Sequence, residues 1–184
     1  MSPVVLIGLT GYAGTGKDTV RAMLEDTGFT GFAFAEPIRG MLRELMTSSG
    51  IDDRYMDERE FKEAAIPELG VSYRQIAQTL GTEWGRAQAP DFWLRIANSL
   101  MSEQIALGGT HFVVSDVRFA NEAQWVRDHG GVIWRVERPE AVPVRAHVSE
   151  CEMHHFTADV TLHNTGSLKD LYRTVMDALD RGPA

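Results

Sequence analysis

The chain has 184 residues, with 18 Lys and Arg against 26 Asp and Glu, which gives a formal net charge of −8. A chain of this length, with 43% hydrophobic residues, fits one compact domain that can bury a core without a metal or disulfide staple. The acidic balance argues against a protein that coats nucleic acid nonspecifically, and no apolar run approaches the roughly 18 residues of a membrane helix.

Short apolar runs alternate along the chain with segments of helical periodicity, which is the pattern of an α/β fold with a parallel sheet. Five apolar runs are predicted strands: residues 4–9, 32–35, 112–115, 132–136 and 159–163. Between them, apolar residues at helical spacing predict helices that begin near residues 19, 37, 73, 93, 119 and 168. Pro37 suits the first turn of the second of these helices, and Ser167 is a good N-cap for the last.

Two connections are longer than crossovers require. Residues 36–111 should form a helical insert near the carboxyl ends of the strands, where open α/β sheets bind ligands. Residues 138–158 are rich in Arg, His, Pro and Glu and are expected to form a mobile lid. The core would then comprise about residues 3–35, 112–137 and 159–181 of a single domain.

The strongest motif is a glycine-rich segment that follows the first predicted strand and precedes the first predicted helix. Glycines let the backbone wrap closely around phosphate oxygens, and the helix that follows adds its positive N-terminal end. A lysine at the end of the loop supplies a charge to the β- and γ-phosphates. The residues expected to bind the donor phosphates are Gly11, Ala13, Gly14, Thr15, Gly16, Lys17, Asp18 and Thr19.

Two carboxylates are candidates for Mg²⁺. Asp18 stands where the phosphate-loop motif has Ser or Thr, whose hydroxyl normally meets the ion, so a carboxylate would serve directly or through water. Asp116 ends the third predicted strand, where it can hold Mg²⁺ through water or orient the acceptor. The alternative for Asp116 is a cap on the helix that begins near Phe119.

An acceptor that is itself a phosphate needs no strong base, but it needs cations that offset the repulsion between two phosphates. Arg39 lies in the first turn of a predicted helix, and Arg74 shares a helix face with Gln78. Arg138 and Arg145 lie in the expected lid. Any one of these arginines could instead be a solvated surface charge.

Together these segments resemble the bacteriophage deoxynucleoside monophosphate kinase family within the P-loop kinases. The matching segments are residues 16–19, 34–39, 74–83, 92–93, 115–119 with Glu122, 147–150 and 164–167. The Asp-Val-Arg-Phe segment that begins at Asp116 and the Leu-Gly-Thr-Glu segment that begins at Leu80 are the more specific of these. The Asp that follows Lys17 also occurs in some phosphomevalonate kinases.

The resemblance implies a three-layer P-loop kinase fold with a five-stranded parallel sheet, and transfer of the γ-phosphate of ATP to a deoxynucleoside 5′-monophosphate with Mg²⁺. It implies catalytic roles for Lys17, Asp116, Arg118 and Arg145, and places Arg138 and Gly166 beside ATP. It assigns the acceptor nucleotide to Arg39, Lys62, Arg74, Gln78, Gly81, Trp93 and Glu122. Its partners would be small nucleotides rather than polymeric nucleic acid or a membrane, and a homodimer is compatible with it.

The N-terminus has no basic region or cleavage signal, and the single cysteine, Cys151, cannot form an intramolecular disulfide. We therefore expect a cytoplasmic protein, in the host cytoplasm if a phage encodes it. Cys151 lies near His147, His154 and His155, so a zinc site in the lid is a less favoured alternative.

The roles of two candidate acceptor residues and the identity of the acceptor stay open on the sequence alone. Trp93 lies on an apolar stripe and could pack in the core rather than contact a base, and Lys62 could lie on a solvated charged helix. The acceptor could be dephospho-coenzyme A or phosphomevalonate, or the protein could be an ATP-binding switch without kinase activity.

Overall fold

The computed structural model describes residues 4–58, 60–139, 153 and 155–182. The chain divides into two compact units: a sheet unit, which combines Met1–Phe34 with Ala97–Ala184, and a helical unit, Ala35–Ile96. The helical unit ends earlier than the insert of 36–111 that we expected. The difference arises because the helix Phe92–Ala106 begins in the helical unit and finishes in the sheet unit.

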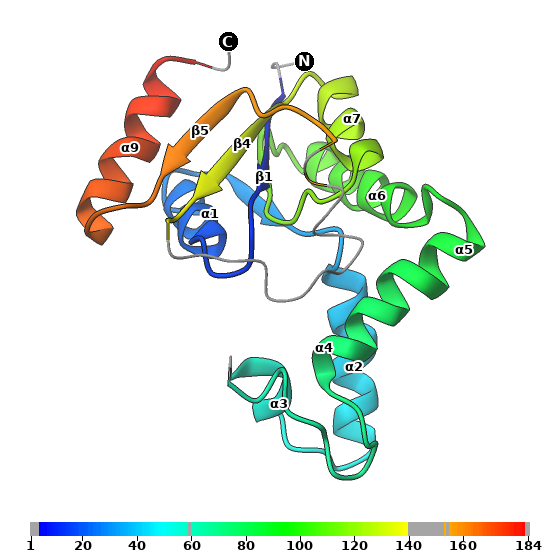
Figure 1. Cartoon of the computed structure of the whole chain (residues 1–184). Coiled ribbons are helices and arrows are strands. Elements are labelled where there is room, and N and C mark those ends of the chain that lie inside the picture. The colour runs from blue at the N-terminus through cyan, green and yellow to red at the C-terminus, as the bar shows by residue number, and fades with distance from the viewer. Residues whose placement is uncertain (1–3, 59, 140–152, 154, 183–184) are drawn as a thin grey trace. The chain divides into compact units, whose positions relative to one another are not determined.

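Five parallel strands form the centre of the sheet unit, in the order β2-β3-β1-β4-β5 (Figure 1). They are β1 (Val5–Thr10), β2 (Thr30–Phe32), β3 (His111–Val114), β4 (Val132–Glu137) and β5 (Val160–His163). The predicted parallel sheet is confirmed, although β2 lies earlier than the predicted 32–35. The ladder between β2 and β3 ends at Phe32 because the Phe34 N–H donates to the Asp116 carboxylate at 2.8 Å.

Helices cover both faces of this sheet. The helices α1 (Lys17–Glu25) and α9 (Leu168–Asp180) pack against each other on one face (Figure 1). They bury a core that includes Leu9 of β1 and Val175 of α9, both fully buried. Each such side chain contributes about 1.5–3 kcal/mol on burial. The helix α7 (Ala120–Asp128) covers the other face, where a Cβ at Gly8 would lie only 3.0 Å from Val126.

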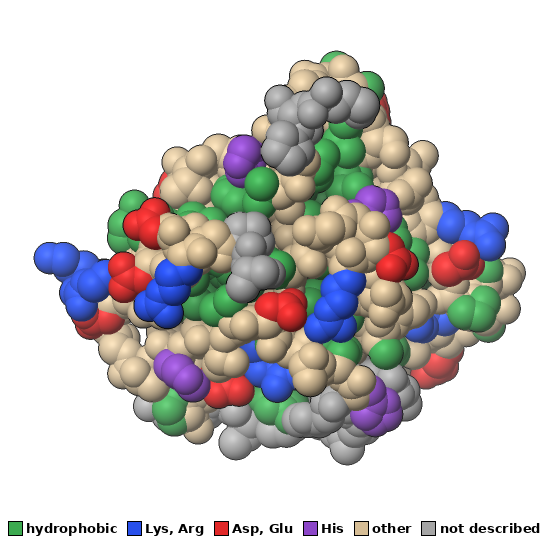
Figure 2. All heavy atoms as spheres, turned by 90° about the horizontal axis from the view of Figure 1, so that it is seen from above, with side chains coloured by type: hydrophobic (Ala, Val, Ile, Leu, Met, Phe, Trp, Pro, Cys, Tyr) green, Lys and Arg blue, Asp and Glu red, His purple; other side chains and the backbone are tan. Residues whose placement is uncertain are grey.

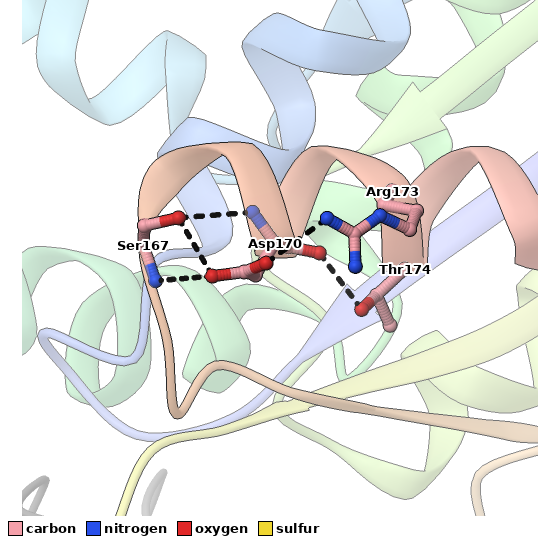
Figure 3. Close-up of polar contacts among 4 residues, drawn as sticks. All are labelled: Ser167, Asp170, Arg173 and Thr174. Atoms are coloured by element: carbon pink, nitrogen blue, oxygen red, sulfur yellow. Dashed lines mark hydrogen bonds and ion pairs between the residues drawn. The ribbon is translucent and has the colours of Figure 1, made fainter.

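The start of α9 is fixed by a reciprocal cap (Figure 3). The Ser167 hydroxyl accepts a hydrogen bond from the Asp170 N–H at 3.3 Å. The Asp170 carboxylate accepts from the Ser167 backbone N–H at 3.0 Å and from its hydroxyl at 2.7 Å. These hydrogen bonds, with a smaller contribution from Arg173, hold the pKa of Asp170 below its ordinary value. The N-cap predicted at Ser167 is confirmed.

The helical unit begins with α2 (Glu36–Ser48), which has Pro37 in its first turn as predicted, followed by the short α3 (Arg54–Asp57). A later helical run starts with α4 (Tyr73–Gln78), widens into a π-helical segment, η1 (Thr79–Gly85), and ends with α5 (Arg86–Gln88). The last helix to begin in this unit is α6 (Phe92–Ala106). Around Lys62, residues 60–63 form turns rather than the charged helix that was the alternative for this segment.

On the face drawn in Figure 2, basic side chains lie among acidic ones and histidines instead of gathering into one positive patch. Acidic residues outnumber basic ones in the chain by 26 to 18, which is consistent with this mixture. No helix in the described part of the chain is both long and apolar enough to cross a membrane.

Candidate active site

Residues 11–16 connect the end of β1 to the start of α1, the strand–loop–helix context that the glycine-rich motif predicts. Gly11, Gly14 and Gly16 take positive φ angles of 136°, 82° and 103°. Such angles strain any residue with a side chain, so glycine is needed where this loop turns. Among the described residues no side chain caps α1, so the first-turn N–H groups of this helix suit a bound anion.

Lys17 folds back over the loop that it follows. Its Nζ atom donates to the carbonyl oxygens of Gly11 and Tyr12, at 2.7 Å in both cases. Thr15 holds the same curve, because its hydroxyl and its backbone N–H donate to the Tyr12 carbonyl at 3.0 and 3.4 Å. The ammonium group therefore lies at the loop, within reach of a phosphate bound by it.

The strands β4 and β5 support the loop from the side. A side chain at Gly11 would collide with the Val136 carbonyl, so the loop lies directly against β4. Asn164 comes directly after β5, and its Nδ2 atom donates to the Thr15 carbonyl at 2.8 Å. Its backbone N–H donates to the Glu137 carbonyl at 2.7 Å. Sequence reasoning gave Asn164 no role of its own; its position at the end of a predicted strand is the signal that could have indicated one.

A pocket of about 260 Å³ lies beside the phosphate loop, entirely within the sheet unit. Tyr12 and Thr15 line it from the loop, Arg138 from the segment after β4, and Thr165 from the segment after β5. Arg138, which is expected to contact ATP, thus lines this pocket. Gly166, which is also expected beside ATP, follows the lining residue Thr165 in the chain. The pocket joins directly to the loop that would hold phosphates.

The two candidate metal ligands differ in their surroundings. Asp18 is exposed in the first turn of α1, where a carboxylate is also favourable to the helix dipole. Asp116 is 9% exposed, and its Oδ1 atom accepts the Phe34 N–H. The alternative that Asp116 caps α7 is wrong, because the N-cap of that helix is Phe119.

Glu122 is buried, and its side chain binds backbone N–H groups at the start of α7. Its carboxylate accepts from the N–H groups of Arg118 and Phe119, at 2.8 and 3.1 Å, and so closes the start of α7. These contacts orient the backbone at Arg118. The expected contact of Glu122 with a polar edge of the acceptor or with the side chain of an arginine stays a prediction.

The helical unit carries the residues expected to bind the acceptor. Arg39 is exposed in the first turns of α2, near Tyr73. Burial raises the pKa of the Tyr73 hydroxyl, while the nearby charges of Arg39 and Arg43 oppose the shift. Arg74 and Gln78 both lie on α4, and the Arg74 side chain forms an ion pair with Glu63, a residue that sequence reasoning missed.

Trp93 lies inside the helical unit. Its indole Nε1–H donates to the Gly81 carbonyl at 2.7 Å, and its ring packs closely against Gly85. The side chain is 5% exposed, which favours the packing alternative over a direct contact with a base. Gly81 also lies against Ile38, so η1 is held between α2 and Trp93.

Part of the expected lid lies outside the described residues. This applies to Arg145 and to three members of the candidate zinc cluster, His147, Cys151 and His154. Arg138 and His155 are described. Among the residues that the structure describes, no three His, Cys, Asp or Glu side chains gather in a way that could hold a metal ion.

The sequence model of the deoxynucleotide monophosphate kinase family matches residues 49–175, well over half of the chain. The chain belongs to this family. It is therefore a kinase that phosphorylates a nucleotide monophosphate, as the resemblance implied. The match begins after the phosphate loop, so the loop and the family are independent observations.

A protein of Acanthamoeba polyphaga mimivirus, named provisionally as a deoxynucleotide monophosphate kinase, is 28% identical over 189 residues. The alignment covers 96% of this chain and 97% of the viral protein. The alignment thus runs through both units of this chain.

Solved structures show the fold class. A protein from Thermus thermophilus matches with a TM-score of 0.54 and 22% identity over 100% of both chains. A sugar kinase from Janibacter matches with a TM-score of 0.53 and 14% identity over 98% of this chain and 96% of its own. Dephospho-CoA kinase from Campylobacter jejuni matches with a TM-score of 0.50 and 13% identity over 96% of both chains. The predicted P-loop kinase fold is confirmed.

Proposed function

We propose that this kinase transfers the γ-phosphate of ATP to a deoxynucleoside 5′-monophosphate and so forms the diphosphate, with Mg²⁺ as cofactor. The observation that carries the proposal is the loop of residues 11–16, whose positive-φ glycines deliver the chain into α1 with Lys17 bonded across the loop. Family membership supplies the class of acceptor.

The donor nucleotide would occupy the sheet unit. Its phosphates fit the loop and the first-turn N–H groups of α1, where Lys17 can exchange its carbonyl partners for phosphate oxygens. Its nucleoside fits the adjoining pocket, with Arg138 on one side and the segment of Thr165 and Gly166 on the other. Asn164 would act indirectly, because it holds the Thr15 carbonyl and so fixes the loop.

The residues around the loop also fit Mg²⁺, which prefers carboxylate and water oxygens. Asp18 and Asp116 would hold it, with water between the ion and at least one carboxylate. When bound, Mg²⁺ supplies positive charge that offsets the negative charge of the phosphates. The Phe34 N–H fixes one oxygen of Asp116, so this carboxylate is oriented before the ion arrives.

The acceptor would be held by the helical unit. Arg39 and Arg74 are the proposed cations for its phosphate, with Lys62 and Gln78 as further contacts, while Arg118 and Arg145 would act at the transferring group. Trp93 would act through Gly81, whose carbonyl it binds, and not by stacking on the base. Since an acceptor phosphate is already ionised, orientation and charge are sufficient for the reaction.

The test is an acceptor panel with ATP and Mg²⁺, in which ADP formation and the phosphorylated product are both measured. We expect ADP release to depend on a deoxynucleoside monophosphate, with ribonucleotides run in parallel to measure sugar selection. Phosphorylation of dephospho-coenzyme A or phosphomevalonate, with no reaction of any deoxynucleotide, would overturn the acceptor. ATP binding without acceptor-stimulated ADP release would instead indicate a switch protein.

We also propose that the enzyme works on free nucleotides in a host cytoplasm. A viral relative that aligns over almost the whole chain supports this setting. Gel filtration of the purified protein would test the homodimer that the family resemblance allows.

A further inference from the structure

The residues that precede α4 form a small hairpin within the helical unit. Ala65 pairs with Ser72 in an antiparallel bridge, and the Ile66 N–H donates to the Val71 carbonyl at 2.9 Å. Ile66 is fully buried, which anchors the turn to the core of the unit. The hairpin therefore has a fixed register.

Beyond the bridge, the chain enters α4, and a backbone contact holds Arg74 of this helix beside the segment that carries Glu63. The Arg74 N–H donates to the Lys62 carbonyl at 3.1 Å. This bond satisfies a backbone donor that the first turn of α4 cannot pair internally. The backbones of the two residues are thus held beside each other before their side chains interact.

The side chains complete the arrangement. The Nε atom of Arg74 is buried and forms an ion pair with Oε1 of Glu63. The two side chains are 27% and 38% exposed, so they are partly shielded from water. The carboxylate meets the guanidinium on its Nε side. The two Nη atoms form the end edge of the group, with parallel donors at the spacing that binds two oxygens of one phosphate.

We propose that Glu63 is a positioning residue for the acceptor phosphate, which it serves by holding the Arg74 guanidinium with its Nη edge directed to that phosphate. The inference rests on the proposed acceptor role of Arg74. A long arginine side chain loses rotamer freedom when it binds a ligand. Glu63 has already restricted that freedom in the free enzyme, so its contribution is to the affinity for the acceptor and not for ATP.

The test compares Glu63→Gln, Arg74→Ala and the double variant by steady-state kinetics with varied deoxynucleotide and varied ATP. We expect Glu63→Gln to raise the KM for the deoxynucleotide roughly fivefold, with the KM for ATP and the melting temperature little changed. In the Arg74→Ala background the same change should have no further effect, because Glu63 acts through Arg74. Glu63→Asp keeps the charge on a shorter side chain and should recover part of the affinity.

Asp91→Asn is the matched control. It removes a carboxylate from another ion pair of the helical unit, with Arg95 at 2.9 Å, and should leave both KM values unchanged. If Arg74→Ala raises the deoxynucleotide KM but Glu63→Gln leaves it unchanged or lowers it, Glu63 does not position Arg74, and the proposed function stands. If Arg74→Ala itself has no effect on that KM, the acceptor role of Arg74 fails together with this inference.

Discussion

Replacing Lys17 with Met tests the phosphate loop most directly, because it removes the charge and keeps most of the side chain's length. The variant loses two hydrogen bonds from Nζ, each 2.7 Å long, to the carbonyls of Gly11 and Tyr12. The lysine is only partly buried, so we expect a loss of about 1–2 kcal/mol in the free energy of unfolding. The fold should survive this loss.

Catalysis should suffer more than stability. Removing one preorganised donor from developing negative charge costs roughly 10²–10³ in kcat, and Lys17 is the cation of the loop. The assay is deoxynucleotide-dependent ADP formation, with urea denaturation of the same preparation to confirm folding. Arg181→Met, which removes an exposed cation at the end of α9, is the control and should retain full activity. Turnover of Lys17→Met within threefold of the parent enzyme would refute the placement of donor phosphates in this loop.

Three further changes address other parts of the structure. Asn164→Ala removes the bond to the Thr15 carbonyl and should raise the KM for ATP several-fold, while an unchanged value would show that the loop holds its shape without it. Gly85→Ala places a methyl group against the Trp93 ring and should lower the unfolding free energy by about 1–3 kcal/mol in denaturant titrations. Gly40→Ala, in open space on α2, is its control and should raise the unfolding free energy by about 0.5–1 kcal/mol. Equal effects of the two substitutions would contradict the packing of Trp93 on Gly85. Hydrogen bonds from Ser167 lower the pKa of Asp170 below its unfolded value of about 4. The stability that the cap on α9 contributes is therefore present above about pH 4 and is lost as the pH falls through the folded pKa. Melting temperatures of Asp170→Asn should lack this part of the acid dependence, and pH profiles of melting temperature that coincide with those of the parent protein would exclude it.

Local patterns in the sequence predicted most of the sheet unit. The apolar runs located four strands within a residue or so, and the glycine-rich motif located the phosphate loop, because these features depend on neighbouring residues alone. The strand β2 was misplaced because its end depends on Asp116, a side chain more than eighty positions away. Apolar composition does not record such a contact.

The helical unit was less predictable for the same reason. The spacing of Tyr73, Ile76 and Leu80 favours one regular helix, but Gly81 and Gly85 pack against Ile38 and Trp93, and the helix widens at η1. Glu63 meets Arg74 only because a hairpin forms between them. Spacing along the chain identified Arg74 as a candidate for binding the acceptor, but only the folded chain brings its partner Glu63 beside it.

The order of the strands has a consequence for synthesis on the ribosome. The central strand β1 is made first, yet its neighbours β3 and β4 begin at His111 and Val132. The phosphate loop follows β1 directly and has bonds from Thr15 and Lys17, but its contacts with Val136 and Asn164 form only after the ribosome has made most of the chain. The helical unit is continuous in sequence and can fold while the later strands are still being translated. Nucleotide binding by the nascent chain should therefore arise late and abruptly, when β5 and Asn164 emerge from the exit tunnel.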